Sequence, residues 1–245
     1  MNDQLPVIEV ADLRVRYGNM EAVKGVSFSL ARGETLGIVG ESGSGKSTIA
    51  KTLIGLEKPY SGKITCRATS MQMVFQDAVG SLNPRMTVRQ TLEEVFKVKR
   101  SRRHTAEQLL DIVGLSPAVL EQYPREMSGG QCQRVSIARA LACEPEVLIA
   151  DEPVSALDVS VQARILNLLR DLRRNLGLAI LLIAHDLAVV RNVCDRVCVM
   201  QSGRFMDVGT SDEVFSNPQS DYTKRLLAAV PDVDRALRLR AKADS

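Results

Sequence analysis

The chain carries a glycine-rich loop closed by a lysine and two hydroxyl side chains: Gly40, Glu41, Ser42, Gly43, Ser44, Gly45, Lys46, Ser47 and Thr48. Gly45 lets the backbone approach an anion closely, Lys46 offers a point charge to terminal phosphates, and the Ser47 hydroxyl suits Mg²⁺. An apolar run at 36–39 predicts a buried strand before the loop, and apolar residues at helical spacing predict a helix after it. The sequence therefore predicts a phosphate-binding loop, in which backbone N–H groups and a helix N-terminus point at the anion.

Two carboxylates and a histidine follow two other apolar runs. One run ends in Asp151 and Glu152, and another ends in His185. The carboxyl ends of parallel strands meet at one edge of a sheet, so we expect these side chains beside the loop. Asp151 is expected to hold Mg²⁺ with Ser47, Glu152 to act as general base toward a water, and His185 to contact the γ-phosphate. A lone histidine after a strand is more often structural, but this placement favours the functional interpretation.

A second glycine pair lies further along the chain, in the run Ser128, Gly129, Gly130 and Gln131, which precedes a helical pattern. A serine cap explains Ser128 but not the two glycines, which leave the helix N-terminus open to an anion. No arginine finger is evident among these motifs, so this N-terminus is the candidate for a further donor to the transition-state charge. Together the parts suffice for Mg²⁺-assisted cleavage of a nucleoside triphosphate.

The remaining patterns predict the elements that position these residues. Alternating residues predict antiparallel strands over 8–15 and 26–30, further strands over 62–65 and 71–75, and a hairpin over 197–208. Residues 84–140 interrupt the α/β pattern and predict an inserted helical subdomain, and a frayed or solvated helix is expected over about 232–245. The fold class is α/β: a phosphate-loop core with a mainly parallel sheet and an N-terminal antiparallel β subdomain, in a single domain over 1–245.

Composition limits the classes of protein. The 245 residues are 45% hydrophobic, enough for a large core, and only 4% aromatic with no Trp, which argues against stacking platforms for nucleic acid. A net charge of +3 is too balanced to indicate nucleic acid by itself. No apolar stretch approaches the ~20 residues of a membrane span and no signal segment is present, so we expect a cytoplasmic protein.

Two further features have simple interpretations. The five cysteines lack metal-type spacing and are expected to be reduced, mostly buried thiols. The basic run from Lys97 to His104 is either a solvated linker or a contact with acidic lipid headgroups or a partner.

The motifs, taken in order, resemble those of the ATP-binding subunits of ATP-binding cassette (ABC) transporters. Residues 40–48 match the Walker A loop, 147–152 the Walker B strand, and 128–131 the signature motif, with Met127 where leucine is most usual. The signature motif is the discriminating one, because most phosphate-loop enzymes lack it. The resemblance covers nearly the whole chain.

The resemblance implies further roles. Tyr17, which on its own is more often a surface or core tyrosine than a ligand contact, would stack on adenine. Gln76 would sense Mg²⁺ and the membrane subunit, residues 155–158 would form the D-loop, and His185 would be the switch histidine. Two cassettes would sandwich two ATP molecules head to tail, so that residues 128–131 of one chain contact the γ-phosphate bound by the other.

Residues 75–77, 81–87 and 222–231 resemble the branch that imports oligopeptides, dipeptides or nickel. That likeness implies an ATPase docked peripherally on the cytoplasmic face of the inner membrane, under two transmembrane permease subunits. A second ABC ATPase subunit, either a copy or a paralogue, and indirectly an extracytoplasmic solute-binding protein would complete the assembly, without nucleic acid. The stretch 62–73 is shorter than the usual hairpin of that branch, which leaves the transported substrate open.

The alternatives are an exporter motor, an ABC ATPase that acts on DNA or the ribosome, and a small-molecule kinase. The residues after Gln76 disfavour the exporter. The second class would carry a long coiled coil or two cassettes in one chain, and a kinase would need no signature motif.

Overall fold

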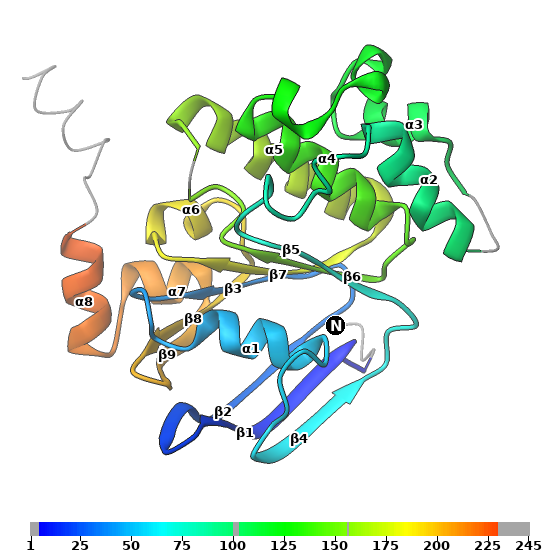
Figure 1. The fold of residues 1–245 in the computed structure, drawn as a ribbon. Helices are drawn as coiled ribbons and strands as arrows, with labels where there is room; N and C mark the ends of the chain where they lie inside the picture. The colour runs from blue at the N-terminus through cyan, green and yellow to red at the C-terminus, as the bar shows by residue number, and fades with distance from the viewer. Residues whose placement is uncertain (1–4, 100–102, 156, 230–245) are drawn as a thin grey trace, which may run out of the picture.

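The computed structural model describes residues 5–99, 103–155 and 157–229. Its main sheet has six strands in the order β5-β6-β7-β3-β8-β9 (Figure 1). These are β5 (Met71–Val74), β6 (Val147–Asp151), β7 (Ala179–Ala184), β3 (Thr35–Val39), β8 (Arg196–Gln201) and β9 (Arg204–Thr210). Neighbouring strands from β5 to β8 run parallel, and β9 pairs antiparallel with β8. The predicted mainly parallel sheet with a terminal hairpin is confirmed.

The three central strands are buried on both faces, as their uninterrupted apolar runs predict. Every residue of β3, β6 and β7 is buried. Alternate side chains enter different cores: Leu148 and Ala150 join the helical side, while Val147 and Ile149 join the side of the second sheet. This double burial fixes the register, because a slip of one residue would exchange the two sets of side chains.

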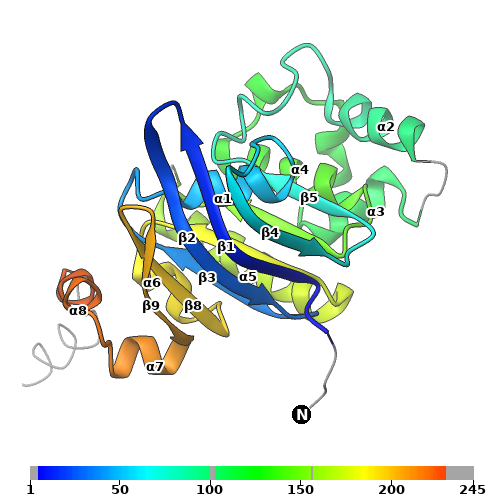
Figure 2. The ribbon, with the colours of Figure 1, turned by 90° about the horizontal axis from the view of Figure 1, so that it is seen from below.

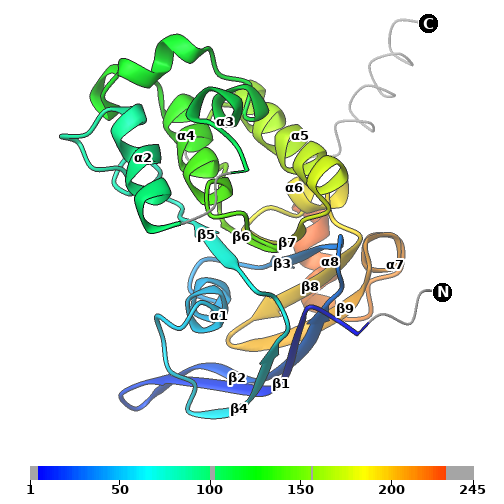
Figure 3. The same cartoon turned by 90° about the vertical axis from the view of Figure 1, so that its right-hand side faces the viewer.

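The second sheet is antiparallel, in the order β2-β1-β4, and consists of β1 (Ile8–Tyr17), β2 (Met20–Leu30) and β4 (Ser61–Cys66). Figure 2 shows it covering one face of the main sheet, and Figure 3 shows helix α1 (Lys46–Leu53) between the two sheets. The strands predicted over 62–65 and 71–75 thus belong to different sheets, although they are close in sequence.

Helices cover the opposite face of the main sheet (Figure 3). They are α2 (Val88–Val98), α3 (Ala106–Ile112), α4 (Gly129–Leu141), α5 (Val159–Leu176) and α6 (Leu187–Arg191), with 3₁₀ turns at Pro117–Glu121 and Pro124–Glu126. Capping boxes at Thr87 and Thr105 begin α2 and α3. A helical segment within 84–140 is present as expected, and its behaviour as a separate subdomain stays a prediction.

The chain continues through α7 (Ser211–Ser216) and α8 (Asp221–Ala228). The predicted tail at 232–245 and residues 100–102 of the basic run lie outside the described residues. Among the helices that the structure describes, none has the length and apolar character to cross a membrane. All five cysteines are free thiols; Cys132, Cys194 and Cys198 are buried and Cys66 is exposed.

Candidate functional site

The loop between β3 and α1 needs its glycines because other backbone segments pack against it. Gly45 has φ +110°, and a Cβ there would lie 2.5 Å from the carbonyl oxygen of Ala22. A Cβ on Gly40 would collide with the carbonyl of Met200. Strands β2 and β8 therefore shape the loop from behind. The first backbone N–H groups of α1 have no intrahelical partners, as at the start of any α-helix, and are available to an anion.

Lys46 is buried inside this loop, with its side chain only 3% exposed. Its Nζ donates to the carbonyl oxygens of Gly40 (2.7 Å) and Glu41 (2.9 Å), and lies 3.9 Å from Oε1 of Glu152. Burial lowers the pKa of Lys46, and the charges of Glu152 and Asp151 oppose that shift. Two neutral carbonyl oxygens thus hold the buried ammonium at the loop. A phosphate oxygen, which carries negative charge, would be a stronger acceptor for it.

Ser47 and Asp151 form an oxygen pair beside Lys46. The Ser47 Oγ donates to Asp151 Oδ1 at 2.9 Å, and Asp151 is 5% exposed. Burial raises the pKa of Asp151, and the hydrogen bond from Ser47 partly offsets it. One hydroxyl and one carboxylate fit Mg²⁺, which takes one or two protein oxygens and completes its shell with phosphate and water. No cluster of three or more His, Cys, Asp or Glu that could cage a metal occurs in the described ranges.

Glu152 is the residue on which the separate motifs converge. Its Oε2 accepts from Gln76 Nε2 at 3.1 Å and lies 3.5 Å from His185 Nδ1, while its Oε1 faces Lys46. The side chain is 14% exposed, against 52% for His185. Glu152 has φ +46°, and its N–H donates to the carbonyl of Ile183 at 3.0 Å, which fixes the turn that follows β6. The predicted meeting of the residues after β3, β6 and β7 is therefore present, while their catalytic roles stay predictions.

The amide nitrogen of Gln76 points at Glu152 and Ser155, and not at the Ser47–Asp151 pair. Its Nε2 donates to Ser155 Oγ at 3.2 Å. A role for Gln76 as a Mg²⁺ ligand stays a prediction. Ser155 belongs to the expected D-loop, of which Ala156 lies outside the described residues.

Ser128 and Gln131 form a reciprocal cap on α4. Ser128 Oγ accepts from the Gln131 N–H at 3.3 Å, and Gln131 Oε1 accepts from the Ser128 N–H at 2.9 Å. A Cβ on Gly130 would lie 2.6 Å from Val161 Cγ1, whereas one on Gly129 would find Leu157 at an ordinary 3.5 Å. Packing thus explains Gly130 and leaves Gly129 without a structural reason.

Helix α4, which Ser128 caps, and helix α1, which follows the phosphate loop, lie on different sides of the main sheet (Figures 1 and 3). Within the part of the chain that the structure describes, no hydrogen bond joins residues 128–131 to residues 40–48. The chain by itself does not bring the two predicted phosphate-binding motifs together.

Tyr17 ends β1 with 40% of its surface exposed. Burial raises the pKa of its phenol, and Thr48 and Glu57 interact with the hydroxyl. Thr48 lies in the first turn of α1, so the Tyr17 hydroxyl is close to the predicted phosphate site. Stacking of the ring on adenine stays a prediction.

The sequence did not indicate two supports of the loop. Tyr222 Oη accepts from the Glu41 N–H at 3.3 Å, and the Gly203 N–H donates to the Ser44 carbonyl at 2.9 Å. Tyr222 and Gly203 both lie in the carboxyl-terminal part of the chain. Residues 222–231 resemble the peptide and nickel importers, but no sequence pattern indicated that Tyr222 contacts the loop. Ser44 Oγ is buried and has no hydrogen-bond partner among the described residues. An orphaned hydroxyl inside the loop fits an anionic ligand, because buried polar groups are normally paired.

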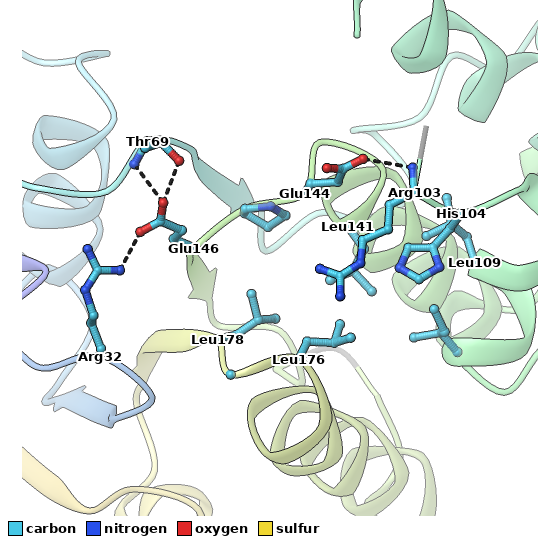
Figure 4. Close-up of a pocket in the computed structure, with 13 residues that line it drawn as sticks. Arg32, Thr69, Arg103, His104, Leu109, Leu141, Glu144, Glu146, Leu176 and Leu178 are labelled. Atoms are coloured by element: carbon cyan, nitrogen blue, oxygen red, sulfur yellow. Dashed lines mark hydrogen bonds and ion pairs between the residues drawn. The ribbon is translucent and has the colours of Figure 1, made fainter. Parts of the chain in front are cut away.

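A separate cavity of about 310 Å³ lies at the other end of the strands (Figure 4). Glu146 lies on its wall, just before β6, and accepts from Thr69 Oγ1 (2.5 Å) and Arg32 (2.6 Å). These bonds lower the pKa of Glu146 to about 2. Since Asp151 lies at the opposite end of β6, this cavity is not part of the nucleotide site.

The family model described as ABC transporter matches residues 23–155. The oligopeptide transport ATP-binding protein OppF of Salmonella typhimurium is 44% identical over 270 residues, covering 96% of this chain and 81% of the relative. The oligopeptide transport ATP-binding protein AppF of Bacillus subtilis is 48% identical, covering 88% and 72%.

Solved structures agree. CbiO1 of Clostridium perfringens, part of an ABC transporter complex, superposes with a TM-score of 0.78 at 28% identity, covering 96% of this chain and all of that one (100%). An ATP-binding cassette in a dimeric post-hydrolysis state with ADP and phosphate gives 0.73 at 27% identity, covering 83% and 98%. Both the predicted fold class and the predicted family are confirmed: the protein belongs to the ABC transporter family, as one of its ATP-binding subunits.

Proposed function

We propose that this chain is the ATP-hydrolysing motor subunit of an ABC importer for peptides. The observation that carries the proposal is the convergence on Glu152 of Lys46, Gln76 and His185, next to the Ser47–Asp151 pair. The relatives named for oligopeptide transport support the peptide cargo. No contact described above favours export, the main alternative.

The loop would bind ATP through its backbone N–H groups and Lys46, and Tyr17 would stack on the adenine. Mg²⁺, held by Ser47 and Asp151, would neutralise charge on the terminal phosphates. Gln76 would respond to the presence of Mg²⁺ and phosphate through its hydrogen bond to Glu152.

Glu152 would take the proton of the attacking water at its carboxylate. The hydrogen bond from Gln76 Nε2 at 3.1 Å orients the carboxylate. His185, about half exposed at the same carboxylate, would hold the water in line and contact the γ-phosphate.

The site would be completed by a second cassette, a copy or a paralogue, whose Ser128–Gln131 segment meets the γ-phosphate. The separation of these motifs within one chain, and the solved dimeric relative, support this arrangement. Two permease subunits would dock at the apolar cavity of about 420 Å³ that Gln76 and the half-exposed Val79 line. A solute-binding protein would deliver the peptide from outside, and this chain would lie peripherally on the cytoplasmic face.

The test is Glu152→Gln, with Glu107→Gln on α3 as a matched control away from the loop. Glu152→Gln should retain ATP binding, lower turnover by about two to four orders of magnitude, and accumulate an ATP-bound dimer in size-exclusion chromatography. Glu107→Gln should behave like the parent. Unchanged steady-state hydrolysis in Glu152→Gln would reject Glu152 as the base.

Peptide import itself is tested in vesicles that contain the permease subunits and the binding protein. ATP-dependent uptake of a labelled oligopeptide should require this chain and fail with Glu152→Gln. Uptake that continues with the variant would refute the motor role.

A further inference from the structure

Helix α8 contacts the phosphate loop through one side chain. Tyr222 is 5% exposed, its ring belongs to the helical-side core with Val214, and its hydroxyl accepts the Glu41 N–H at 3.3 Å. Figure 1 shows α8 beside the loop that joins β3 to α1. The core thus fixes the ring and leaves the hydroxyl as the group that reaches the loop.

The start of α8 is anchored independently of Tyr222. Asp207 on β9 is 8% exposed and accepts from the N–H groups of Gln219 (3.0 Å) and Ser220 (3.1 Å). Burial opposes ionisation of Asp207, but hydrogen bonds from Ser220 and Thr223 outweigh it and hold the pKa of this carboxyl below its usual value. Ser220 in turn caps α8 by accepting the Thr223 N–H at 3.1 Å. The helix is therefore fixed to β9 at the end that carries Tyr222.

The Glu41 N–H and the Gly40 carbonyl belong to the same planar peptide unit. The carbonyl accepts from Lys46 Nζ at 2.7 Å, while the N–H donates to Tyr222. In a trans peptide the two groups point in opposite directions, so Tyr222 and Lys46 hold one peptide plane from its two sides. A rotation of this plane that released Tyr222 would also remove an acceptor that positions the Lys46 ammonium.

We propose that Tyr222 is a positioning residue for phosphate binding: its hydroxyl fixes the Gly40–Glu41 peptide and, through it, the place of Lys46. This rests on the proposed function, in which the loop binds the phosphates of ATP. The inference concerns the polyphosphate part of the nucleotide and not the adenine.

The test is Tyr222→Phe in the full chain, with Tyr123→Phe as a control that removes a hydroxyl from the helical region far from the loop. Affinities for ATP and for inorganic tripolyphosphate are measured by calorimetric titration. Tyr222→Phe should weaken both ligands by the same factor of about five, the effect of one neutral hydrogen bond. Tyr123→Phe should leave both affinities at the parent values.

Asp207→Asn gives a second perturbation, since it weakens the anchor of α8 and keeps the Tyr222 hydroxyl. It should also weaken tripolyphosphate binding, and in amide NMR spectra both variants should shift the Glu41 resonance. Parent-like tripolyphosphate affinity in Tyr222→Phe would overturn the inference. Failure of the parent itself to bind ATP would instead overturn the proposed function, so the two failures are distinguishable.

Discussion

The paired glycines at the start of α4 have different reasons to be glycine, and alanine substitution can separate them. In Gly130→Ala the new Cβ would lie 2.6 Å from Val161 Cγ1, far inside van der Waals contact. Val161 is β-branched and has few rotamers to escape into. In Gly129→Ala the nearest atom, Leu157 Cδ2, lies 3.5 Å away and needs no movement.

Both substitutions gain a similar helix propensity, so that term cancels when the two variants are compared. The difference in unfolding free energy then reports the overpacking at Val161, which typically costs about 1–3 kcal/mol. We expect Gly130→Ala to be less stable than Gly129→Ala by about that amount. Urea unfolding at constant m-value measures it.

Val161→Ala provides the rescue, because it removes the methyl group that the new Cβ would meet. The double variant Gly130→Ala/Val161→Ala should be more stable than the sum of the single effects predicts. Equal stability of the two alanine variants, or strict additivity in the double variant, would refute the packing explanation. Gly129→Ala should remain stable yet lose ATP-driven dimerisation, because no packing contact among the described residues accounts for that glycine.

Three other perturbations test single contacts. Tyr17→Ala should weaken ATP binding by about 1–3 kcal/mol, the range for loss of a base–aromatic stack, and leave tripolyphosphate affinity unchanged in the same titration; equal losses for both ligands would argue against stacking. Ser47→Ala should reduce ATP affinity about tenfold with Mg²⁺ present and little in excess EDTA, since the hydroxyl is proposed to act through the metal; a loss that is equal in EDTA would contradict that role. Glu146, whose folded pKa is about 2 against 4.5 unperturbed, contributes stability that is present above pH 4.5 and lost as pH falls toward 2. With the side chain 31% exposed and screened, we expect about 1 kcal/mol above pH 4.5. Glu146→Gln should remove it, so the unfolding free energies of parent and variant should differ above pH 4.5 and converge toward pH 2; a difference that does not change with pH would contradict this.

The sequence predicted those parts of the site that lie at the carboxyl ends of parallel strands. Apolar runs that end in Asp151 and His185 indicate parallel strands, and parallel strands must present their carboxyl ends at one edge. The contacts of Glu152 with Lys46 and His185 follow from that rule together with the loop motif. The sequence did not indicate that β7 lies between β6 and β3, because local pattern says nothing about strand order.

The spacing of apolar residues along the chain did not predict contacts between segments that are distant in sequence. Residues 62–65 and 71–75 both read as strands, yet the pattern could not assign them to two different sheets. The bond of Tyr222 to Glu41 spans 181 residues and has no local signature. Nor could the sequence explain Gly130, since its requirement comes from Val161 on another helix.

The position of Glu152 links the chemistry to the rest of the assembly. One carboxylate receives the amide of Gln76, faces the Lys46 ammonium, and lies 3.5 Å from His185. A shift of Gln76 therefore changes the orientation of the proposed base directly, without any movement of the sheet. Because these contacts share one carboxylate, substitutions at Gln76 and His185 cannot act independently of Glu152. A phosphate that draws the Lys46 ammonium away from Glu152 Oε1 would alter the same carboxylate from the opposite side, so in the proposed mechanism nucleotide and Gln76 act on a common group.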